Sequence, residues 1–231
     1  MVGKTKQILG AGIGKKAGEK TTMAGYVSEA VIKRLPAYYR HLKELEKEGV
    51  VQISSQGLGE RMAFTASQIR QDINCFGGFG RQGYGYNVTE LREHIGHIMG
   101  VDQKHRMIIL GAGNIGHAVA QSESFARNGF ETVAIFDNSA QCIGTVIGGL
   151  EVQDVANLER YIQEHPVDIA VLALPMGCAQ QMADQLCGYG IRGFWNFAPL
   201  DLKLPKGASV VNVHLDEGLE VLSFRMMHSE G

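Results

Sequence analysis

The sequence predicts an α/β protein, with an N-terminal winged helix-turn-helix, then a Rossmann-like, doubly wound parallel sheet, and a C-terminal helix. Three observations predict this fold class. Three short helical patterns precede a glycine-rich, aromatic segment. Beyond it, apolar strands alternate with amphipathic helices, the order typical of a parallel sheet. The first of these strands runs into a G-x-G-x-x-G motif.

Charge divides the chain in two. Residues 1–81 carry 13 Lys and Arg against 7 Asp and Glu, whereas residues 82–231 carry 9 against 17, so the net charge of −2 conceals a basic front half. Such asymmetry indicates that the front half meets a polyanion. Residues 1–25 are interpreted as a flexible basic tail. The glycines of 9–14 lack the strand and helix that a nucleotide motif needs.

Composition also argues against several classes. The longest apolar runs are too short to span a bilayer and no signal-peptide layout is visible, so we expect a cytoplasmic protein without a membrane partner. Neither the histidines nor the cysteines have metal-ligand spacing, so no metal site is expected. The cysteines fit reduced, mostly buried thiols: Cys75, Cys142, Cys178 and Cys187.

The front half contains three helical patterns in sequence. Apolar residues recur at helical spacing behind Pro36, and Gly49 follows as a stop signal. The apolar positions are Leu35, Tyr39, Leu42 and Leu45. Ser54 or Ser55 can cap a short second helix, and Thr65 can cap a third over 66–76.

The third helix has a polar surface suited to nucleic acid. Ile69, Ile73 and Phe76 form its apolar stripe. The other faces carry residue types that contact base edges and phosphates: Ser67, Gln68, Arg70, Gln71 and Asn74. An ordinary solvated face is the alternative. The glycines and aromatics of 76–86, together with Arg81, fit a hairpin that reaches along DNA and favour a winged helix-turn-helix.

The segment 106–120 is the most informative in the chain. An apolar strand ends at Leu110 and is followed by Gly111-Ala112-Gly113-Asn114-Ile115-Gly116 and then by a helical pattern. The first glycine permits a tight turn, the second admits a pyrophosphate and the third lets the helix pack closely. The helix N-terminus adds amide donors and a positive dipole end.

A carboxylate follows the next strand. Asp137 ends the apolar run 132–136 and lies 21 residues past the last glycine, close to the spacing expected for a ribose-binding acid. A carboxylate accepts from a 2′-hydroxyl and repels a 2′-phosphate, and no arginine follows it directly. NAD(H) is therefore favoured over NADP(H).

The remaining sheet elements follow in alternation. A connecting helix is expected over 88–100. Strands are expected near 150–152, 168–174, 193–197 and 209–213, and helices over 155–164 and 179–187. Ligands bind beyond the carboxyl ends of such strands, which places Leu174, Pro175 and Asn196 near the nicotinamide. Prolines that merely end strands are the alternative for that region.

The last helix, expected from Asp216 to about 227, carries an apolar stripe. Leu215, Leu219, Leu222 and Met226 recur at i, i+4, i+7 and i+11. The stripe fits either its own sheet or a second copy of the chain, and two-fold symmetry suits a protein that binds a palindrome.

Five motifs together resemble the Rex family of bacterial redox-sensing transcriptional repressors over residues 26–227. They are Arg34-Leu-Pro-Ala-Tyr-Tyr-Arg40, Thr65-Ala-Ser-Gln-Ile-Arg70-Gln-Asp72, the segment 76–88, the glycine motif 111–116 and Trp195-Asn-Phe-Ala-Pro199. The resemblance implies a homodimer with swapped C-terminal helices, which binds operator DNA when NAD⁺ prevails and releases it when NADH binds.

The resemblance also implies residue roles. The recognition helix around Arg70 and the wing residues Arg81 and Gln82 contact DNA, and Arg40 contacts a phosphate. The glycine motif and Asp137 bind the cofactor. Two positions depart from the family pattern: Ser122 replaces a tyrosine near the nicotinamide, and His214 replaces an aspartate near the swapped helix. These two positions form a polar pair in the family's switch.

The implied organisation is a DNA-binding domain over 26–100, a dinucleotide-binding domain over 101–213 and a helix for dimer exchange over 214–231. An NAD-dependent oxidoreductase is the main rival, but a chain of this size leaves little room for a substrate pocket beside the cofactor domain. We therefore expect no enzyme activity. A repressor that binds a different nucleotide is a third hypothesis.

Overall fold

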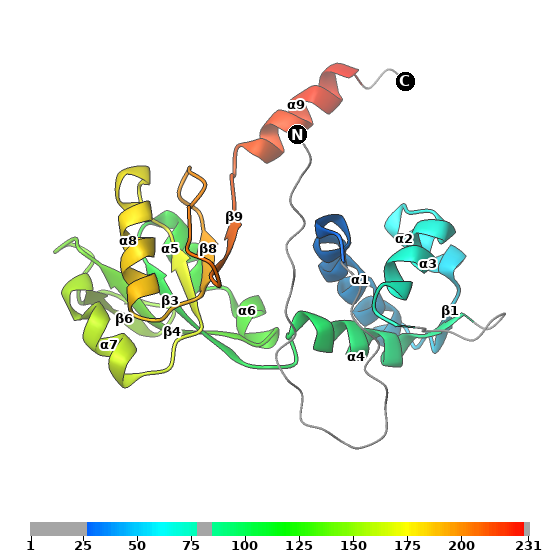
Figure 1. The fold of residues 1–231 in the computed structure, drawn as a ribbon, viewed down its shortest axis with the longest axis horizontal. Coiled ribbons are helices and arrows are strands. Elements are labelled where there is room, and N and C mark those ends of the chain that lie inside the picture. The colour runs from blue at the N-terminus through cyan, green and yellow to red at the C-terminus, as the bar shows by residue number, and fades with distance from the viewer. Residues whose placement is uncertain (1–26, 78–84, 229–231) are drawn as a thin grey trace. The chain divides into compact units, whose positions relative to one another are not determined.

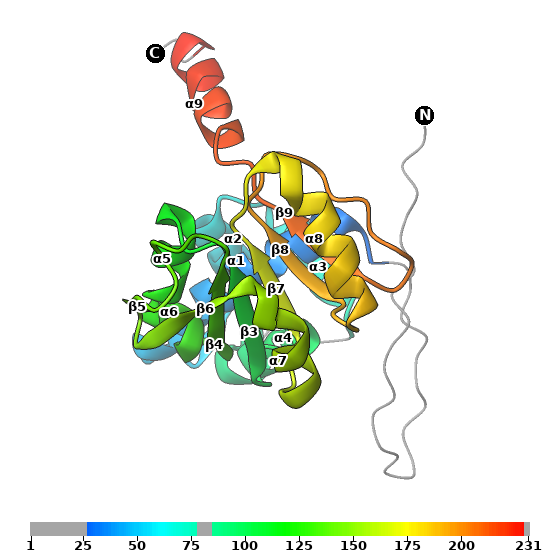
Figure 2. The same cartoon turned by 90° about the vertical axis from the view of Figure 1, so that its left-hand side faces the viewer.

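The computed structural model describes residues 27–77 and 85–228. The chain divides into two compact units at the boundary between Asp102 and Gln103 (Figures 1 and 2). Each unit has its own hydrophobic core. The predicted tail over 1–25 and the wing residues Arg81 and Gln82 lie outside the described residues.

The first, or front, unit is a helix-turn-helix with two added helices. Its elements are α1 (Glu29–Lys47), β1 (Gln52–Ile53), α2 (Ser55–Met62), α3 (Ala66–Asn74), β2 (Tyr86–Asn87) and α4 (Val88–Met99). The two short strands, one before α2 and the other before α4, pair antiparallel. The predicted caps are confirmed: the side chains of Ser54 and Thr65 accept from backbone N–H groups in the first turns of α2 and α3.

Two details of α1 differ from the prediction. The helix begins at Glu29, so Pro36 lies inside it rather than ahead of it. Tyr38 is 1% exposed, whereas Tyr39, predicted for the apolar stripe, is only partly buried. Both tyrosines are compatible with the helical period, and the hydroxyl of Tyr38 is satisfied inside the unit by a hydrogen bond to Asp72.

The second, or sheet, unit contains a seven-stranded sheet in the order β5-β6-β4-β3-β7-β8-β9. The strands are β3 (His105–Leu110), β4 (Phe130–Asp137), β5 (Val146–Ile147), β6 (Leu150–Asp154), β7 (Ile169–Leu172), β8 (Gly193–Asn196) and β9 (Ser209–Asn212). All neighbours are parallel except β5 and β6, which form a hairpin at one edge. The six parallel strands have the order of a Rossmann sheet, so the predicted fold class is confirmed.

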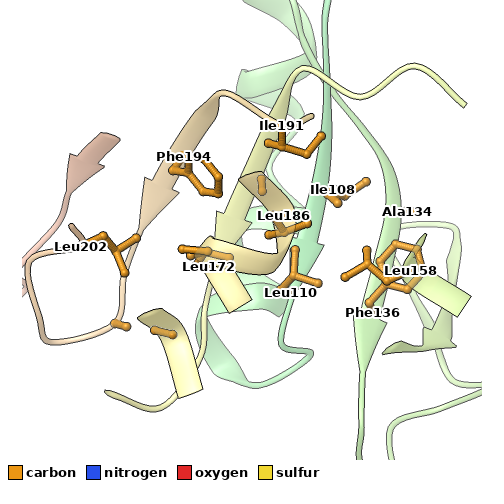
Figure 3. Packing of buried hydrophobic residues seen from close by; sticks show 14 residues of the cluster. Ile108, Leu110, Ala134, Phe136, Leu158, Leu172, Leu186, Ile191, Phe194 and Leu202 are labelled. Carbon is orange, nitrogen blue, oxygen red and sulfur yellow. The ribbon is translucent and has the colours of Figure 1, made fainter. Parts of the chain in front are cut away.

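Helices cover both faces of the sheet. They are α5 (Asn114–Ala120), α6 (Glu123–Arg127), α7 (Leu158–Glu164, preceded by the 3₁₀ turn η1, Val155–Asn157) and α8 (Met176–Gly188). The chain continues after β9 into α9 (Glu217–His228). Successive strand residues alternate between the faces. Ile108 and Leu110 pack with α7 and α8, as Figure 3 shows for Leu158 and Leu186, while Met107 and Ile109 pack on the side of α5 and α6.

The last helix differs from the others because every one of its residues is exposed. Its apolar side chains are between 51% and 79% exposed: Leu219, Val221, Leu222, Phe224, Met226 and Met227. The helix (red in Figure 1) therefore does not cover its own sheet, which was one of the two alternatives left open by the sequence.

Candidate dinucleotide and nucleic-acid sites

The glycine motif lies where the strand order of the sheet reverses. β3 has β4 on one side and β7 on the other, and the connections from β3 and β6 leave in opposite directions. Gly111 follows β3 with φ of +101°, and a Cβ there would lie 2.4 Å from the carbonyl oxygen of Ala173, which follows β7. Only glycine fits this turn without strain. A crevice at the carboxyl ends of the strands is the usual ligand position in such sheets.

The other two glycines have different surroundings. A Cβ at Gly116 would lie 1.9 Å from the carbonyl oxygen of Gly111, so the helix α5 can approach the turn only with glycine there. Gly113 has no atom within 4 Å of the Cβ position and is exposed. Asn114 beside it is also exposed, while Ala112 is buried and Ile115 half-buried. The open side of the turn is thus lined by backbone, as a pyrophosphate requires.

Asp137 is held against this turn. Its Oδ2 accepts from the backbone N–H of Ala112 at 2.6 Å, and its Oδ1 accepts from the backbone N–H of Ser139 at 2.7 Å. The carboxylate is half-buried. Two bonds leave about half of its lone-pair positions available. A ribose with free hydroxyls fits this acceptor.

The predicted nicotinamide-side residues divide into two kinds. Leu174 and Pro175 follow β7 at the rim, half-buried and exposed respectively. Asn196 is 0% exposed, and its Nδ2 lies within hydrogen-bonding distance of the oxygens of Ala198, Leu200 and Asn212. Its Oδ1 accepts from the backbone N–H of Ala198. The Asn196 amide is therefore held by the loop after β8 and by Asn212 at the end of β9.

The two positions that depart from the family pattern have other partners in the described chain. Ser122 is half-buried at the start of α6, and its hydroxyl lies 2.8 Å from that of Ser124. His214 has its Nε2 3.1 Å from Oδ1 of Asp201. The hydrogen bond to Asp201 raises the pKa of the His214 imidazole.

The candidate DNA contacts lie mostly on exposed surface of α3. Ser67, Gln71 and Asn74 are exposed, and their side chains make no hydrogen bond within residues 27–77 and 85–228; the same holds for Arg40 on α1. Arg70 is exposed and donates to the hydroxyl of Ser55 on α2 at 3.0 Å. These donors and acceptors are of the kinds that contact phosphates and base edges.

Gln68 differs from its neighbours because it belongs to a buried polar cluster. It is half-buried and bonds to Asp72, which also accepts from Arg34 and Tyr38. This cluster was not predicted from the sequence. Its signal was a charged residue, Asp72, adjacent to the buried Ile73 and three residues from Ile69 on the apolar stripe.

Two kinds of feature are absent from the described residues. No helix within residues 27–77 and 85–228 is long and apolar enough to cross a membrane. Over the same ranges, no group of three His, Cys, Asp or Glu side chains is arranged to hold a metal ion.

A helix-turn-helix joined in one chain to a Rossmann sheet defines a class of ligand-responsive transcription regulators. The family described as "Putative DNA-binding protein N-terminus" matches residues 26–74, and the "CoA binding domain" family matches residues 102–200. Two relatives named redox-sensing transcriptional repressor Rex, from Clostridium tetani and Thermoanaerobacter sp., are each 48% identical over 204 residues. These matches cover 88% of this chain and 97% and 91% of the relatives.

Solved structures agree. The chain is 48% identical to RSP in complex with β-NAD⁺ and operator DNA, with a TM-score of 0.83, covering 87% of this chain and 92% of that one. For RSP, a Rex-family repressor, in complex with β-NADH, the identity is 46%, the TM-score 0.80 and the coverage 87% and 95%. The chain belongs to the Rex family of redox-sensing transcriptional repressors. These relatives are named as regulators, which disfavours the oxidoreductase considered from the sequence.

Proposed function

We propose that this chain binds palindromic operator DNA as a homodimer when NAD⁺ prevails and releases it when NADH binds to the sheet domain. The observation that carries the proposal is the Gly111–Gly116 turn at the reversal point of the sheet, with Asp137 bonded to it, in the same chain as a helix-turn-helix. The RSP complexes with operator DNA and with both cofactors support it.

The cofactor site is proposed from the fit of the residues present. Gly113 leaves open space for a pyrophosphate beside the N-terminus of α5, and Asp137 keeps acceptor positions for ribose hydroxyls. Leu174 and Pro175 line the nicotinamide end. A 2′-phosphate would face the like charge of Asp137, so NAD(H) is preferred over NADP(H).

The DNA surface is proposed to consist of α3 with the wing and part of α1. The contact residues are Arg40, Ser67, Gln68, Arg70, Gln71, Asn74, Arg81 and Gln82. Residues 26–100 form the DNA-binding domain and residues 101–213 the dinucleotide-binding domain. A regulator of DNA transcription in bacteria works in the cytoplasm, which is the proposed location.

The dimer is proposed to form through residues 214–231. Every residue of α9 is unburied although the helix carries six apolar side chains more than half exposed. A second copy of the same chain covers such a surface with two-fold symmetry, and a two-fold dimer presents two recognition helices to the halves of a palindrome.

The decisive experiment is fluorescence anisotropy of a labelled palindromic duplex selected by the protein, titrated with NADH, NAD⁺, NADPH, ADP-ribose, ATP and coenzyme A. We expect release by NADH and little effect of NADPH. Release by coenzyme A or ATP but not NADH would assign the site to another nucleotide, which is the third hypothesis from the sequence and is favoured by the family match over 102–200. A chain that selects no duplex would overturn the DNA-binding proposal.

A further inference from the structure

The carboxylate of Asp72 is the centre of a closed hydrogen-bond cluster between α1 and α3. The side chain is 1% exposed. Its Oδ2 accepts from Arg34 Nε at 2.7 Å and from the Tyr38 hydroxyl at 2.9 Å. Its Oδ1 accepts from Arg34 Nη2 at 2.8 Å and from Gln68 Nε2 at 2.7 Å. Four donors therefore fill the acceptor positions of one buried carboxylate.

The cluster is anchored outside α3. Arg34 lies on α1. Its guanidinium also lies 5.8 Å from the ring centroid of Phe64, a residue of the turn between α2 and α3. A bidentate guanidinium with a second contact has little freedom to rotate. Asp72 is consequently fixed with respect to both the first helix and the turn.

The charge of Asp72 determines which end of the Gln68 amide faces it. Burial raises the pKa of the Asp72 carboxyl, but the hydrogen bonds from Arg34, Gln68 and Tyr38 together leave that pKa below its usual range. The group is thus ionised and can only accept. The amide nitrogen of Gln68 has to face it, which settles a choice that an isolated amide leaves open.

We propose that Asp72 is a positioning residue for sequence recognition: it holds Gln68 in a single amide orientation, with the carbonyl oxygen and the second N–H offered in a fixed order to a base edge. This rests on the proposed DNA binding of α3. Paired acceptor and donor groups from one amide match the major-groove edge of adenine. Gln68 therefore reads an adenine in each half-site.

Gln71 provides the matched control on the same helix. It is exposed, and its side chain has no hydrogen-bond partner within the described ranges. The two glutamines have the same side chain, but only Gln68 is hydrogen-bonded to Asp72. If Asp72 acts by orienting the Gln68 amide, its replacement should change the preference for the base that Gln68 contacts. The preference for any base that Gln71 contacts should not change.

The test measures base preference in addition to affinity. A duplex is selected by the full-length protein from a random palindromic pool, and each base pair of a half-site is replaced by the other three. We expect one adenine preference of about tenfold or more that Gln68→Ala removes. Asp72→Asn, whose amide can accept or donate, should reduce that same preference to about threefold or less and leave the preferences at other positions unchanged. Gln71→Ala should leave it intact.

Several results would overturn the proposal. A uniform loss of affinity in Asp72→Asn, with every base preference retained, would show a purely structural role. Retention of the adenine preference in Gln68→Ala would show that Gln68 does not read it. A wild-type chain that selects no duplex would instead overturn the DNA-binding function itself.

Gln68→Glu keeps the proposal testable if Asp72→Asn does not fold, as judged by thermal unfolding of the front unit. A glutamate cannot donate to Asp72 and is repelled by it, so it turns outward as an acceptor only. The preference at that base pair should then move from adenine to cytosine, whose amino group donates. An unchanged adenine preference in Gln68→Glu would also overturn the proposal.

Discussion

Asp72 and Asp137 are two carboxylates tied to their own units by hydrogen bonds, and they differ in what those bonds leave free. Asp72 is 1% exposed and accepts four side-chain hydrogen bonds, three of them from α1. Asp137 is half-buried, accepts two backbone hydrogen bonds and lies beside an open turn. Asp72 is saturated by protein donors, whereas Asp137 keeps acceptor capacity.

This difference indicates how a carboxylate's role is recognised. An ion pair buried with all acceptor positions filled stabilises one arrangement of helices and has nothing left for a ligand. A carboxylate that is oriented by backbone donors and still open on one side is pre-organised for an external donor. Disrupting the Asp72 ion pair should therefore lower the stability of its unit, whereas changing Asp137 should mainly lower ligand affinity.

The largest effect is expected for Arg34→Ala. It leaves the carboxylate of Asp72 buried without its charged partner, and breaking such a pair costs about 3–5 kcal/mol. The free energy of unfolding of the front unit should fall by that amount in urea denaturation, while NADH affinity of the sheet unit stays the same. A decrease in the free energy of unfolding below about 1 kcal/mol would show that water reaches Asp72. Asp72 would then be open to other donors, as Asp137 is.

The same cluster gives an acid dependence. The pKa of Asp72 in the folded chain lies below its ordinary value of 3.8, so its contribution to stability is complete above that value and is lost as pH falls through the folded pKa. Acid unfolding of the front unit should therefore follow protonation of this group. The Asp72→Asn variant, where it folds, should lose that part of the pH dependence.

The next prediction compares two glycines of the sheet unit, Gly116, which is needed for packing, and Gly113, which faces the proposed ligand. Gly116→Ala forces a methyl against the carbonyl of Gly111 and should cost about 1–3 kcal/mol of stability or more. Gly113→Ala is the control, because its Cβ position is open. It should keep stability within about 0.5 kcal/mol and weaken NADH binding at least about tenfold, measured by calorimetry. Equal NADH affinity in Gly113→Ala would contradict the pyrophosphate assignment.

Much of the sheet unit could be predicted from the sequence because its strands are buried on both faces and appear as continuous apolar runs, such as 106–110 and 168–174. The glycine motif carries its own geometry: the positive φ of Gly111 and the crowding at Gly116 follow from residue type. The two-residue strand β5 was missed because so short a segment has no period.

The front unit was predicted in outline and missed in its polar core. Tyr38 and Tyr39 both fit the helical period, and only a contact with Asp72, 34 residues away, distinguishes them. The Arg34 and Asp72 pair spans 38 residues, a separation that helical spacing cannot show. Asn196 stays a prediction for the ligand site. Its burial and its amide contacts with the loop after β8 and with Asn212 on β9 follow from no sequence period.

Replacing Arg70 tests the exposed face of α3, the helix that also carries Asp72. Within residues 27–77 and 85–228, the Arg70 guanidinium donates one hydrogen bond, to the Ser55 hydroxyl in an exposed contact. A DNA acceptor can replace Ser55 with little loss of stability. Arg70→Ala should weaken operator binding by about 1–3 kcal/mol and leave NADH affinity unchanged. If Arg70 contacts a phosphate, the slope of affinity against salt should also fall by about 1. Unchanged operator affinity in anisotropy titrations would remove Arg70 from the interface.

Asp137→Asn tests the open carboxylate. The amide keeps the size of the side chain but loses the negative charge. The hydrogen bond from the ribose hydroxyl to the carboxylate is then no longer charge-assisted, and a 2′-phosphate is no longer repelled. The loss of NADH binding free energy should be at most about 1.5–3 kcal/mol, the contribution of a hydrogen bond to a charged group. NADH binding should weaken and the preference over NADPH should narrow. Stability should change far less than in Arg34→Ala. Wild-type protein that binds NADPH as tightly as NADH by calorimetry would show that Asp137 does not face the ribose.

The smallest expected change in operator affinity concerns Ser122. Its hydroxyl contacts Ser124 and neither Asp72 nor Asp137. A serine reaches less far than the tyrosine implied by the family pattern, so the hydrogen bond that a phenol gives the NAD⁺-bound form is missing or carried by water. NADH should still release DNA through the glycine motif, whereas NAD⁺ should barely raise operator affinity. Ser122→Tyr should then strengthen the NAD⁺ effect by about 1 kcal/mol, the usual contribution of one hydrogen bond. Operator titrations at fixed NAD⁺ compare the two proteins, and strong enhancement already in the wild type would assign the tyrosine's role to another group, with His214 the first to test.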